Sequence, residues 1–304
     1  MQNGMRYVLI TAVRNEAGLI EHTLRAVMAQ TVLPERWIIV DDGSTDGTAG
    51  VVRRVAAGQR WIELVSSPPR REGNFAGKAN AVNMAFGRLQ ATEFDVVGNV
   101  DGDVSFDEEY MSFLLQRFAM FPQLGVAGTP FTEIGGYDSA RDSFEGDQYV
   151  AGPVQLFRAE CFRDIGGYVP NPAGGVDWIA VMTARMRGWG VRSFPDKRFH
   201  HHRTMGTAGR GRLAALFSYG QKDYYLGGLL LWQLCRVMYR AMKRPYLIGA
   251  CALLAGYLWA AIKRVPRAVT PELMAYHRRE QGVKLKKIAG RLLRLRSVDP
   301  FSVE

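Results

Sequence analysis

Residues 94–103 read Phe94-Asp95-Val96-Val97-Gly98-Asn99-Val100-Asp101-Gly102-Asp103, an apolar run that ends in two aspartates around a glycine. An earlier stretch has the same form and reads Trp37-Ile38-Ile39-Val40-Asp41-Asp42-Gly43-Ser44-Thr45-Asp46-Gly47-Thr48. In an open α/β sheet, ligands bind outside the carboxyl ends of the strands. We therefore expect both groups of carboxylates at one edge of such a sheet, on backbone that the strands hold in place.

The spacing of Asp101 and Asp103 lets both carboxylates approach one divalent cation, because the glycine between them permits a tight turn. Hard cations such as Mg²⁺ and Mn²⁺ take oxygen ligands and usually share them with substrate phosphates. The motif therefore predicts a site for a nucleotide diphosphate and its metal. A solvated turn is the alternative, since Asp and Gly are common turn formers.

The order of the predicted elements strengthens this interpretation. A strand at 7–13 runs into Arg14-Asn15-Glu16 and is followed by a helix, the strand before Asp41, and a second helix. A short strand at 61–65, a helix that opens at 77–83 and the strand before Asp101 complete the series. Such alternation predicts an α/β fold with a mostly parallel, doubly wound, Rossmann-like sheet flanked by helices.

With these motifs in order, the chain resembles the bacterial family 2 glycosyltransferases, which have the GT-A fold. The resemblance covers about the first two thirds of the chain, and five or more ordered motifs make coincidence an unsatisfactory explanation. The matching segments are 12–16, 40–46, 77–83, 101–103, 152–158, 165–168, 175–178 and 195–202. The resemblance implies a GT-A domain at 1–218. A change of composition near Tyr219 predicts a helical, apolar and basic membrane-associating region at 219–304.

The resemblance also implies roles for the donor site. Asp42 is expected to contact the nucleobase, with Asp41 and Asp101 supporting the nucleotide; capping of the following turn is the alternative for Asp41. Lys78, near a helix start, could offer its charge to a phosphate, or be a solvated surface lysine. The other residues expected at the donor nucleotide are Ala12, Arg14 and Glu16.

The expected metal ligands are Asp103 and Asp101, with a histidine from His200-His201-His202. His201 aligns best, and His202 is next. Alternation along a strand would point His200 and His202 to the same side. Arg203 and Arg210 continue into a glycine-rich segment that we interpret as a lid for the leaving diphosphate, or alternatively as a plain flexible loop.

Asp177 is the expected general base. Family members place a Glu-Asp pair here, but this chain has Val176 at the glutamate position. The aspartate is kept, so base catalysis is retained while the support of its carboxylate is altered. Capping of the following helix is a compatible alternative for Asp177.

The C-terminal part has a different composition. Residues 246–262 form a run of 17 residues without a charge, and Lys263-Arg264 closes it. This length is at the lower edge for a spanning helix, so a helix lying in one leaflet fits better, and a buried core helix is the alternative. A basic helix is expected after Pro271, with an apolar stripe at Leu285, Ile288, Leu292 and Leu295. Such a helix suits an anionic membrane surface, although a solvated helix on the main domain is possible.

Composition agrees with this organisation. The formal net charge of +10 over 304 residues points to an acidic partner such as a membrane surface, nucleic acid or phosphorylated substrates. Cys161, Cys235 and Cys251 form no CxxC pattern and indicate buried thiols in a reducing compartment. The first apolar run is the opening strand, so no signal peptide is expected.

The resemblance implies an inverting, metal-dependent transfer from a nucleotide-sugar, with a UDP-sugar favoured, to an acceptor hydroxyl. The C-terminal part suggests a membrane-held, polyprenyl-linked acceptor for surface polysaccharide synthesis at the cytoplasmic face of the inner membrane. A nucleotidyltransferase is one rival, but it would need a basic glycine-rich signature after the first strand. A nucleic-acid-binding protein is the other. Nucleic acid is not expected as a partner, because the basic residues flank apolar runs and not stacking aromatics.

Overall fold

The computed structural model describes residues 4–67, 75–89, 91–134, 136–142, 146–171, 174–203, 211–243 and 245–293. The chain divides into two compact units, Met1–Arg203 and Thr204–Glu304. The sequence-based boundary at 218/219 falls inside helix α8 (Arg212–Tyr225), which packs closely on a later helix of the second unit. The fold therefore places the whole of this helix with the C-terminal unit.

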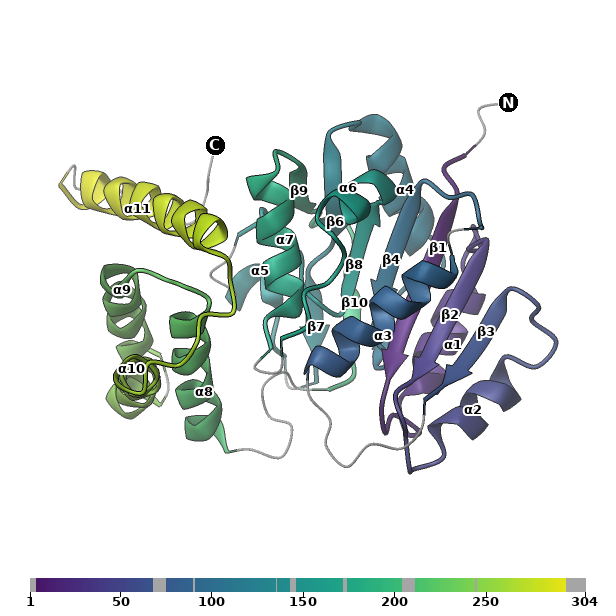
Figure 1. Cartoon of the computed structure of the whole chain (residues 1–304), viewed down its shortest axis with the longest axis horizontal. Coiled ribbons are helices and arrows are strands. Elements are labelled where there is room, and N and C mark those ends of the chain that lie inside the picture. The colour runs from purple at the N-terminus through teal and green to yellow at the C-terminus, as the bar shows by residue number, and fades with distance from the viewer. Residues whose placement is uncertain are drawn as a thin grey trace. The chain divides into compact units, whose positions relative to one another are not determined.

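The first unit is built on a sheet of seven strands (Figure 1). Every neighbouring pair is parallel except those that involve β8, which runs antiparallel to both of its neighbours. The mostly parallel sheet expected from the sequence is thus confirmed. In spatial order the strands are β3 (Ile62–Ser66), β2 (Arg36–Asp41), β1 (Tyr7–Val13), β4 (Val96–Val100), β8 (Val154–Arg158), β6 (Leu124–Gly128) and β9 (Gly190–Ser193).

Helices cover both faces of this sheet. Alternate residues of β1 enter different cores: Tyr7 and Leu9 pack on one face, and Val8 and Ile10 on the other. Strands buried on both faces must be nearly all apolar, which is why β1, β2 and β4 read as continuous hydrophobic runs. The first core contains residues of α1 (Ile20–Met28), α2 (Thr48–Val55) and α4 (Tyr110–Met120), and the second those of α3 (Phe75–Arg88), α6 (Ala159–Asp164) and α7 (Val176–Met186).

A second sheet of three strands brings distant segments to the aspartate turn. Its strands, in order, are β5 (Val104–Ser105), β10 (Phe199–His201) and β7 (Phe131–Glu133), and α5 (Ser139–Asp142) follows β7. His201 pairs with Val104 across this sheet, and the His202 amide donates to the Asp103 carbonyl over 2.8 Å. The histidine segment is therefore fixed beside Asp103.

The loops after β1 and β2 are joined by side chain–backbone hydrogen bonds. The Thr45 amide donates to Asn15 Oδ1 over 2.8 Å, and the Asn15 amide donates to Ser44 Oγ over 2.9 Å. Asp46 accepts from the Ala17 amide over 3.0 Å. These contacts hold the loop after β1 and the loop after β2 together, and so fix the positions of the side chains that both loops carry.

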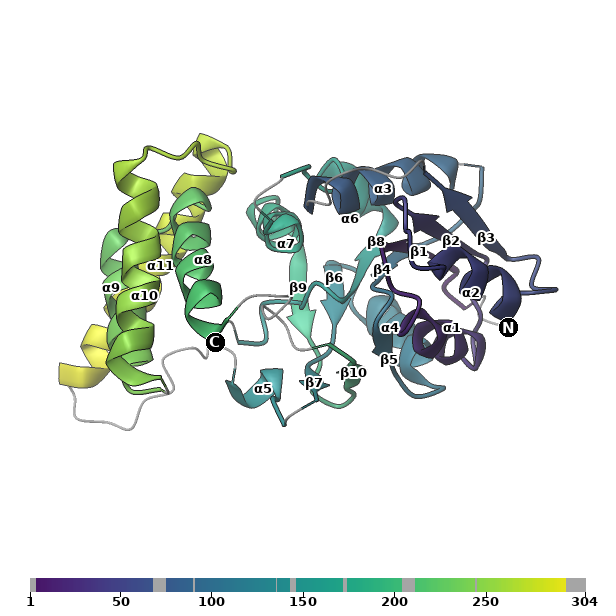
Figure 2. The same ribbon diagram turned by 90° about the horizontal axis from the view of Figure 1, so that it is seen from below.

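The C-terminal unit consists of α8, α9 (Leu230–Ala241), α10 (Tyr246–Ile262) and α11 (Pro271–Leu293). Helices α8 and α10 run side by side (Figure 2). Their backbones approach so closely that a Cβ at Gly220 would overlap the Leu253 carbonyl, and one at Gly256 the Phe217 carbonyl. The absence of a side chain at these two positions is therefore what permits the close approach of the helices.

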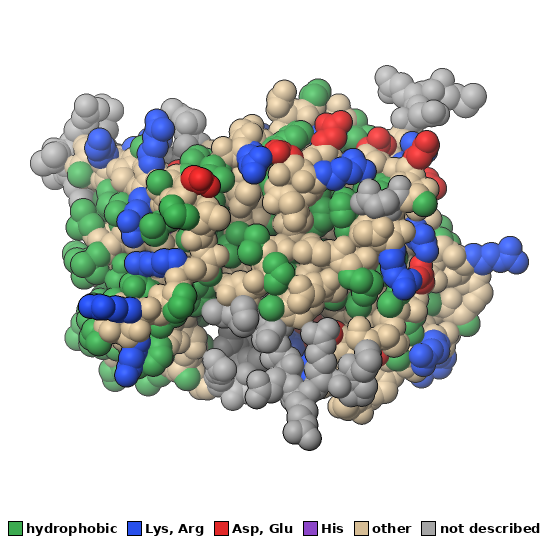
Figure 3. Space-filling model, in the orientation of Figure 1, with side chains coloured by type: hydrophobic (Ala, Val, Ile, Leu, Met, Phe, Trp, Pro, Cys, Tyr) green, Lys and Arg blue, Asp and Glu red, His purple; other side chains and the backbone are tan. Residues whose placement is uncertain are grey.

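Polar and apolar residues of this unit are distributed in an unusual way. Gln233 and Gln281 are buried, and Asp223 forms a half-buried ion pair with Arg236. By contrast, 14 of the 21 exposed large hydrophobic side chains found among the described residues lie in this unit. Figure 3 shows such side chains interspersed with Lys and Arg over the C-terminal helices. Among the helices described, none combines the length and hydrophobicity required to cross a membrane.

Candidate active site

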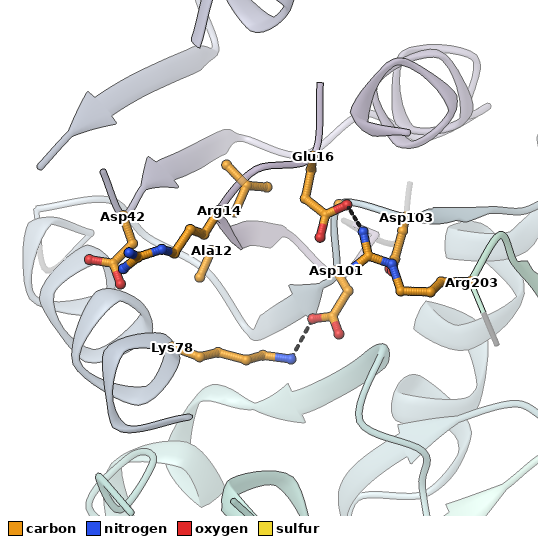
Figure 4. Close-up of a pocket in the computed structure, with 10 residues that line it drawn as sticks. Ala12, Arg14, Glu16, Asp42, Lys78, Asp101, Asp103 and Arg203 are labelled. Atoms are coloured by element: carbon orange, nitrogen blue, oxygen red, sulfur yellow. Dashed lines mark hydrogen bonds and ion pairs between the residues drawn. The ribbon is translucent and has the colours of Figure 1, made fainter. Parts of the chain in front are cut away.

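A cavity of about 430 Å³ opens at the carboxyl ends of β1, β2 and β4. Figure 4 shows its walls, and the labelled side chains converge from the end of β1, from the loops after β1, β2, β4 and β10, and from helix α3. Its lining residues are Ala12, Val13, Arg14, Glu16, Asp42, Lys78, Asp101, Gly102, Asp103 and Arg203. The structure thus brings together eight of the side chains that the sequence analysis selected.

One end of the cavity is formed by Arg14 and Asp42. Asp42 is nearly buried, and its amide donates to the Val13 carbonyl over 2.9 Å, which ties the ends of β1 and β2 together. The Arg14 side chain extends toward the Asp42 carboxylate (Figure 4). This end offers a carboxylate and a guanidinium, groups that can recognise the polar edge of a base or a ribose.

Asp41 is placed differently from Asp42. Its carboxylate accepts from the Ser44 amide over 2.9 Å, and the residue is buried behind the cavity wall. This is the turn-capping arrangement that the sequence left open for Asp41. The residue shapes the turn that carries Asp42 and does not line the cavity.

Lys78, on α3, forms an ion pair with the carboxylate of Asp101 in the cavity wall (Figure 4). Burial disfavours the charge of Lys78, but Asp101, Asp177 and Asp103, in decreasing order, together outweigh burial and raise the pKa of the lysine. Burial also raises the pKa of Asp101, with Lys78 opposing and Asp103 adding to the shift. A charged, half-buried lysine is thus available at the strand end, and it is not a solvated surface residue.

Asp103 and His201 are neighbours. His201 Nε2 lies 3.4 Å from Asp103 Oδ2, and His201 Nδ1 lies 3.3 Å from Glu133 Oε1. Burial opposes both charges, but each group offsets the cost for the other, so the pKa of His201 is raised and that of Asp103 is lowered. A carboxylate that orients a histidine ring is the usual outer support of a histidine ligand.

The side chain of His202 contacts residues other than Asp103. Its Nε2 lies 2.8 Å from Ser105 Oγ, and its ring stacks on His22 with centroids 4.3 Å apart. Burial, then His22 and His200, lower the pKa of His202. The rings of His200 and His202 touch, as strand alternation predicts, while His201 is the histidine directed to Asp103.

Glu16 and Arg203 close the other side of the cavity. Arg203 Nη2 lies 2.6 Å from Glu16 Oε2, and its Nε lies 3.6 Å from Asp103 Oδ2. Burial, followed by the charge of Asp103, raises the pKa of Glu16 to about 7, although Arg203 opposes the shift. Three carboxylates, those of Glu16, Asp101 and Asp103, therefore lie close together in this wall. They form ion pairs with Arg203, Lys78 and His201, respectively. Arg210, the other predicted lid residue, lies outside the described residues.

Asp177 lies in the first turn of α7, outside the lining of this cavity. The N-cap of the helix is Gly175, so Asp177 does not cap it. Tyr149 donates from its hydroxyl to Asp177 Oδ2 over 3.1 Å. The charge of Asp177 nevertheless contributes to the raised pKa of Lys78, so the candidate base is near enough to the cavity to interact electrostatically with a residue of its wall.

Two side chains of this region were not anticipated from the sequence. Glu133 reaches His201 only because β7 pairs with β10, and Tyr149 reaches Asp177 from a loop before β8. Neither residue stands in a recognisable motif. For Glu133 the sequence offers only a glutamate within the short segment Phe131-Thr132-Glu133, and for Tyr149 it offers no signal.

Residues 8–163 match the family described as Glycosyl transferase family 2, which is just over half of the chain. The chain belongs to glycosyl transferase family 2. Membership of this family argues against the nucleotidyltransferase alternative.

Curated relatives match part of this chain. A poly-β-1,6-N-acetyl-D-glucosamine synthase of Staphylococcus aureus (strain MSSA476) is 30% identical over 128 residues, which are 42% of this chain and 28% of the relative. The synthase of Staphylococcus epidermidis is 25% identical over 183 residues, or 54% of this chain and 41% of the relative. The chain thus spans less than half the length of these relatives.

Solved structures show the same fold. The mannosyltransferase PcManGT from Pyrobaculum calidifontis, in complex with GDP-Man and Mn²⁺, matches with a TM-score of 0.57 and 20% identity over 99% of this chain and 83% of that chain. S. aureus TarS 1–349 in complex with UDP-GlcNAc matches with a TM-score of 0.58 and 14% identity over 98% of this chain and 89% of that chain. At such identities the matches establish the GT-A fold.

The GT-A fold raises the question of a divalent cation. Within the described ranges, no three or more His, Cys, Asp or Glu side chains are arranged to hold a metal ion by themselves. Asp103 and His201 nevertheless present a carboxylate and an imidazole next to each other, in a wall crowded with carboxylates. Mg²⁺ and Mn²⁺ are often held by one or two protein ligands together with substrate phosphates, so these residues fit such an ion.

Proposed function

We propose that this protein is a glycosyltransferase that moves a sugar from a nucleotide-sugar, in the first instance a UDP-sugar, to an acceptor hydroxyl with inversion at the anomeric carbon. The observation that carries the proposal is the cavity itself. It gathers Asp42, Lys78, Asp101, Asp103 and Arg203 at the carboxyl ends of the strands, where α/β proteins bind nucleotides. The UDP-GlcNAc in the TarS structure and the GlcNAc polymer in the names of the curated relatives favour a UDP-sugar.

The chemistry follows from the charges around the cavity. Asp42 and Arg14 would bind the nucleoside, and Lys78 and Arg203 would hold the diphosphate. As the acceptor oxygen bonds to the anomeric carbon, the bond from that carbon to the diphosphate breaks, and Lys78 and Arg203 stabilise the negative charge that leaves. Asp177 takes the proton of the acceptor hydroxyl. No covalent intermediate with the enzyme is required.

Asp103 and His201 are the residues that would hold a divalent cation, with Asp101 beside them. When bound, such an ion neutralises the diphosphate oxygens as charge develops on them. Glu133 keeps the His201 ring directed toward Asp103 through its contact with Nδ1.

We also propose that the C-terminal unit binds the surface of a membrane. Leu247 and Ile248 of α10 are 70% and 65% exposed, and Met238 of α9 is 70% exposed, while Gln233 and Gln281 are buried. Apolar residues outside and polar residues inside suit a unit that lies against lipid. Lys243 and Lys263 flank α10 and would attract an anionic surface.

The site of action follows from this contact. We propose an acceptor that is itself membrane-held, such as a polyprenyl-linked saccharide of a surface polysaccharide. The enzyme would then work at the cytoplasmic face of the inner membrane.

A donor screen tests the activity. The full chain is incubated with UDP-GlcNAc, UDP-glucose, UDP-galactose or GDP-mannose in the presence of MgCl₂ or MnCl₂, and release of the nucleoside diphosphate is measured. We expect one UDP-sugar to give the highest rate, and the rate to fall when EDTA is added. Preference for GDP-mannose would overturn the choice of nucleotide, and undiminished release in EDTA would overturn the metal dependence.

A further inference from the structure

The carboxylate of Asp177 is held on one of its oxygens by two residues of the loop before β8. Tyr149 donates from its hydroxyl to Oδ2 over 3.1 Å. A Cβ added to Gly152 would lie 2.6 Å from the same oxygen, so the carboxylate packs directly against the backbone at this position. One oxygen is therefore fixed by a hydrogen bond on one side and by close backbone contact on the other.

The loop that supplies this support is itself tied to the catalytic edge of the sheet. The Gly152 carbonyl accepts from Asn99 Nδ2 over 3.2 Å, and the Pro153 carbonyl accepts from the Asp101 amide over 2.8 Å. Next to Tyr149, the Val150 carbonyl accepts from Gln155 Nε2 over 2.8 Å. Movement of the loop would break these bonds, so the position of the Asp177 carboxylate is linked to that of the Asp101 turn.

The residue before Asp177 cannot provide such support. Val176 occupies the position at which the family resemblance leads us to expect a glutamate, and its side chain is buried in the hydrophobic core between α7 and the sheet. Polar support for the base must therefore come from elsewhere in the fold. Tyr149 supplies it from 28 residues upstream.

We propose that Tyr149 and Gly152 position the general base: Tyr149 donates to Asp177 Oδ2, and Gly152 leaves the space that the carboxylate occupies. This inference rests on the proposed role of Asp177. Tyr149 is a positioning residue, because it acts through Asp177 and not on the substrate. A hydrogen bond from the phenol favours the ionised carboxylate, which is the form that can accept a proton.

The substitution Tyr149→Phe tests the hydrogen bond. Steady-state release of the nucleoside diphosphate is measured on the full chain, with water as the acceptor and with the sugar nucleotide that gives the highest rate in the donor screen. We expect kcat to fall about tenfold and the acid limb of its pH profile to move up by about one unit, because a hydrogen bond to a charged group is lost. The KM for the donor should stay within twofold, since Tyr149 does not line the donor cavity. The charge of Asp177 also raises the pKa of Lys78 and of Tyr168. Neither residue is substituted in this variant, so a shift of the pH profile reports the loss of the Tyr149 hydroxyl.

Gly152→Ala provides a second, independent variant. The added methyl group would lie 2.6 Å from Oδ2, 2.9 Å from Cγ and 3.0 Å from Cβ of Asp177, so the carboxylate must rotate away and the two segments must separate by a few tenths of an ångström. We expect nucleoside diphosphate binding to persist while kcat falls at least tenfold. Tyr7→Phe is the matched control, because it also removes a phenol hydrogen bond, from Tyr7 to the Val32 carbonyl over 2.7 Å, in a residue that does not line the cavity.

Asp177→Asn, assayed in parallel, separates the two levels of the proposal. If it abolishes turnover while Tyr149→Phe and Gly152→Ala match the Tyr7→Phe control in kcat and pH profile, the positioning role is wrong and the base assignment stands. If Asp177→Asn retains turnover, the base assignment fails and the positioning role fails with it.

Discussion

At the scale of single residues, Glu16 shows that a carboxylate in this cavity is destabilised by burial and by neighbouring carboxylates. Its pKa is raised to about 7, first by burial and then by Asp103. A carboxyl group whose pKa is higher in the folded than in the unfolded state, here about 7 against 4.5, stabilises the fold when it is protonated. That contribution is complete below the unfolded pKa and is lost as the pH rises through 7.

Replacing Glu16 by Gln should therefore change the pH dependence of stability. In metal-free buffer, the melting temperature of Glu16→Gln relative to wild type should increase between pH 5 and pH 8. Because Glu16 is only partly buried, we expect about 1 kcal/mol, or about 2–4 °C. Thermal unfolding at both pH values measures this, and a difference that stays constant or decreases would show that the Arg203 ion pair outweighs the crowding.

The substitution Asp177→Asn should separate binding from transfer. It keeps the shape of the side chain and an oxygen acceptor for Tyr149, but it removes the group that takes the proton. Turnover with the screened donor should fall about 10²- to 10⁴-fold, while the affinity for the nucleoside diphosphate changes little. A loss of turnover below tenfold at saturating donor would contradict the role of Asp177.

At the scale of elements, the sequence and the structure agree wherever the information is local. The turns after β2 and β4 are formed by consecutive residues, so the sequence alone was enough to predict Asp42, Asp101 and Asp103 at strand ends. Strand direction is not local: β8 runs antiparallel to both neighbours, and its sequence has no feature that tells direction. The same limit applies to Glu133, which lies 68 residues from His201 and meets it only through strand pairing.

The contact between α8 and α10 depends on glycine. A Cβ at Gly256 would overlap the Phe217 carbonyl, a backbone atom that cannot move independently of its helix. Gly256→Ala should therefore destabilise the C-terminal unit by about 1–3 kcal/mol. Gly282→Ala on α11 is the control, since its Cβ would enter open space and alanine is the better helix former.

Limited proteolysis and thermal unfolding of both variants test this contact. We expect faster cleavage within α8 to α11 for Gly256→Ala only, with nucleoside diphosphate binding by the first unit retained. Equal behaviour of the two variants would mean that the helix pair tolerates a wider separation.

At the scale of the whole molecule, the surfaces of the two units differ in composition. Among the described residues, most exposed large hydrophobic side chains lie in the C-terminal unit. The sequence predicted the run at 246–262 as a helix, and α10 has these bounds. The sequence could not show which residues of that helix face outward, because its apolar residues surround the whole helix. The exposure of Leu247, Ile248 and Ile262 beside a buried Leu253 follows from packing alone.

Vesicle binding tests the proposed role of this surface. The full chain should co-sediment with vesicles that contain an anionic phospholipid, and high salt should remove only part of it, because salt screens charge but leaves apolar contacts. Replacing Leu247 and Ile248 together by Ser should weaken binding about 30-fold, at about 1 kcal/mol for each side chain. Met120→Ser, at a 61% exposed position of the first unit, is the matched control. Unaltered binding of the double variant, or no binding of the wild type, would contradict the membrane proposal.

The central claim is that the cavity binds a nucleoside diphosphate with a divalent cation. The most direct measurement is calorimetric titration of UDP, GDP and dTDP into the full chain, with and without MnCl₂, for wild type and Asp103→Asn. We expect UDP to bind best to the wild type, Mn²⁺ to increase its affinity at least tenfold, and Asp103→Asn to lose that increase while keeping the wild-type fold. If no nucleoside diphosphate binds, or if Mn²⁺ strengthens binding equally in both proteins, the account of this site is wrong.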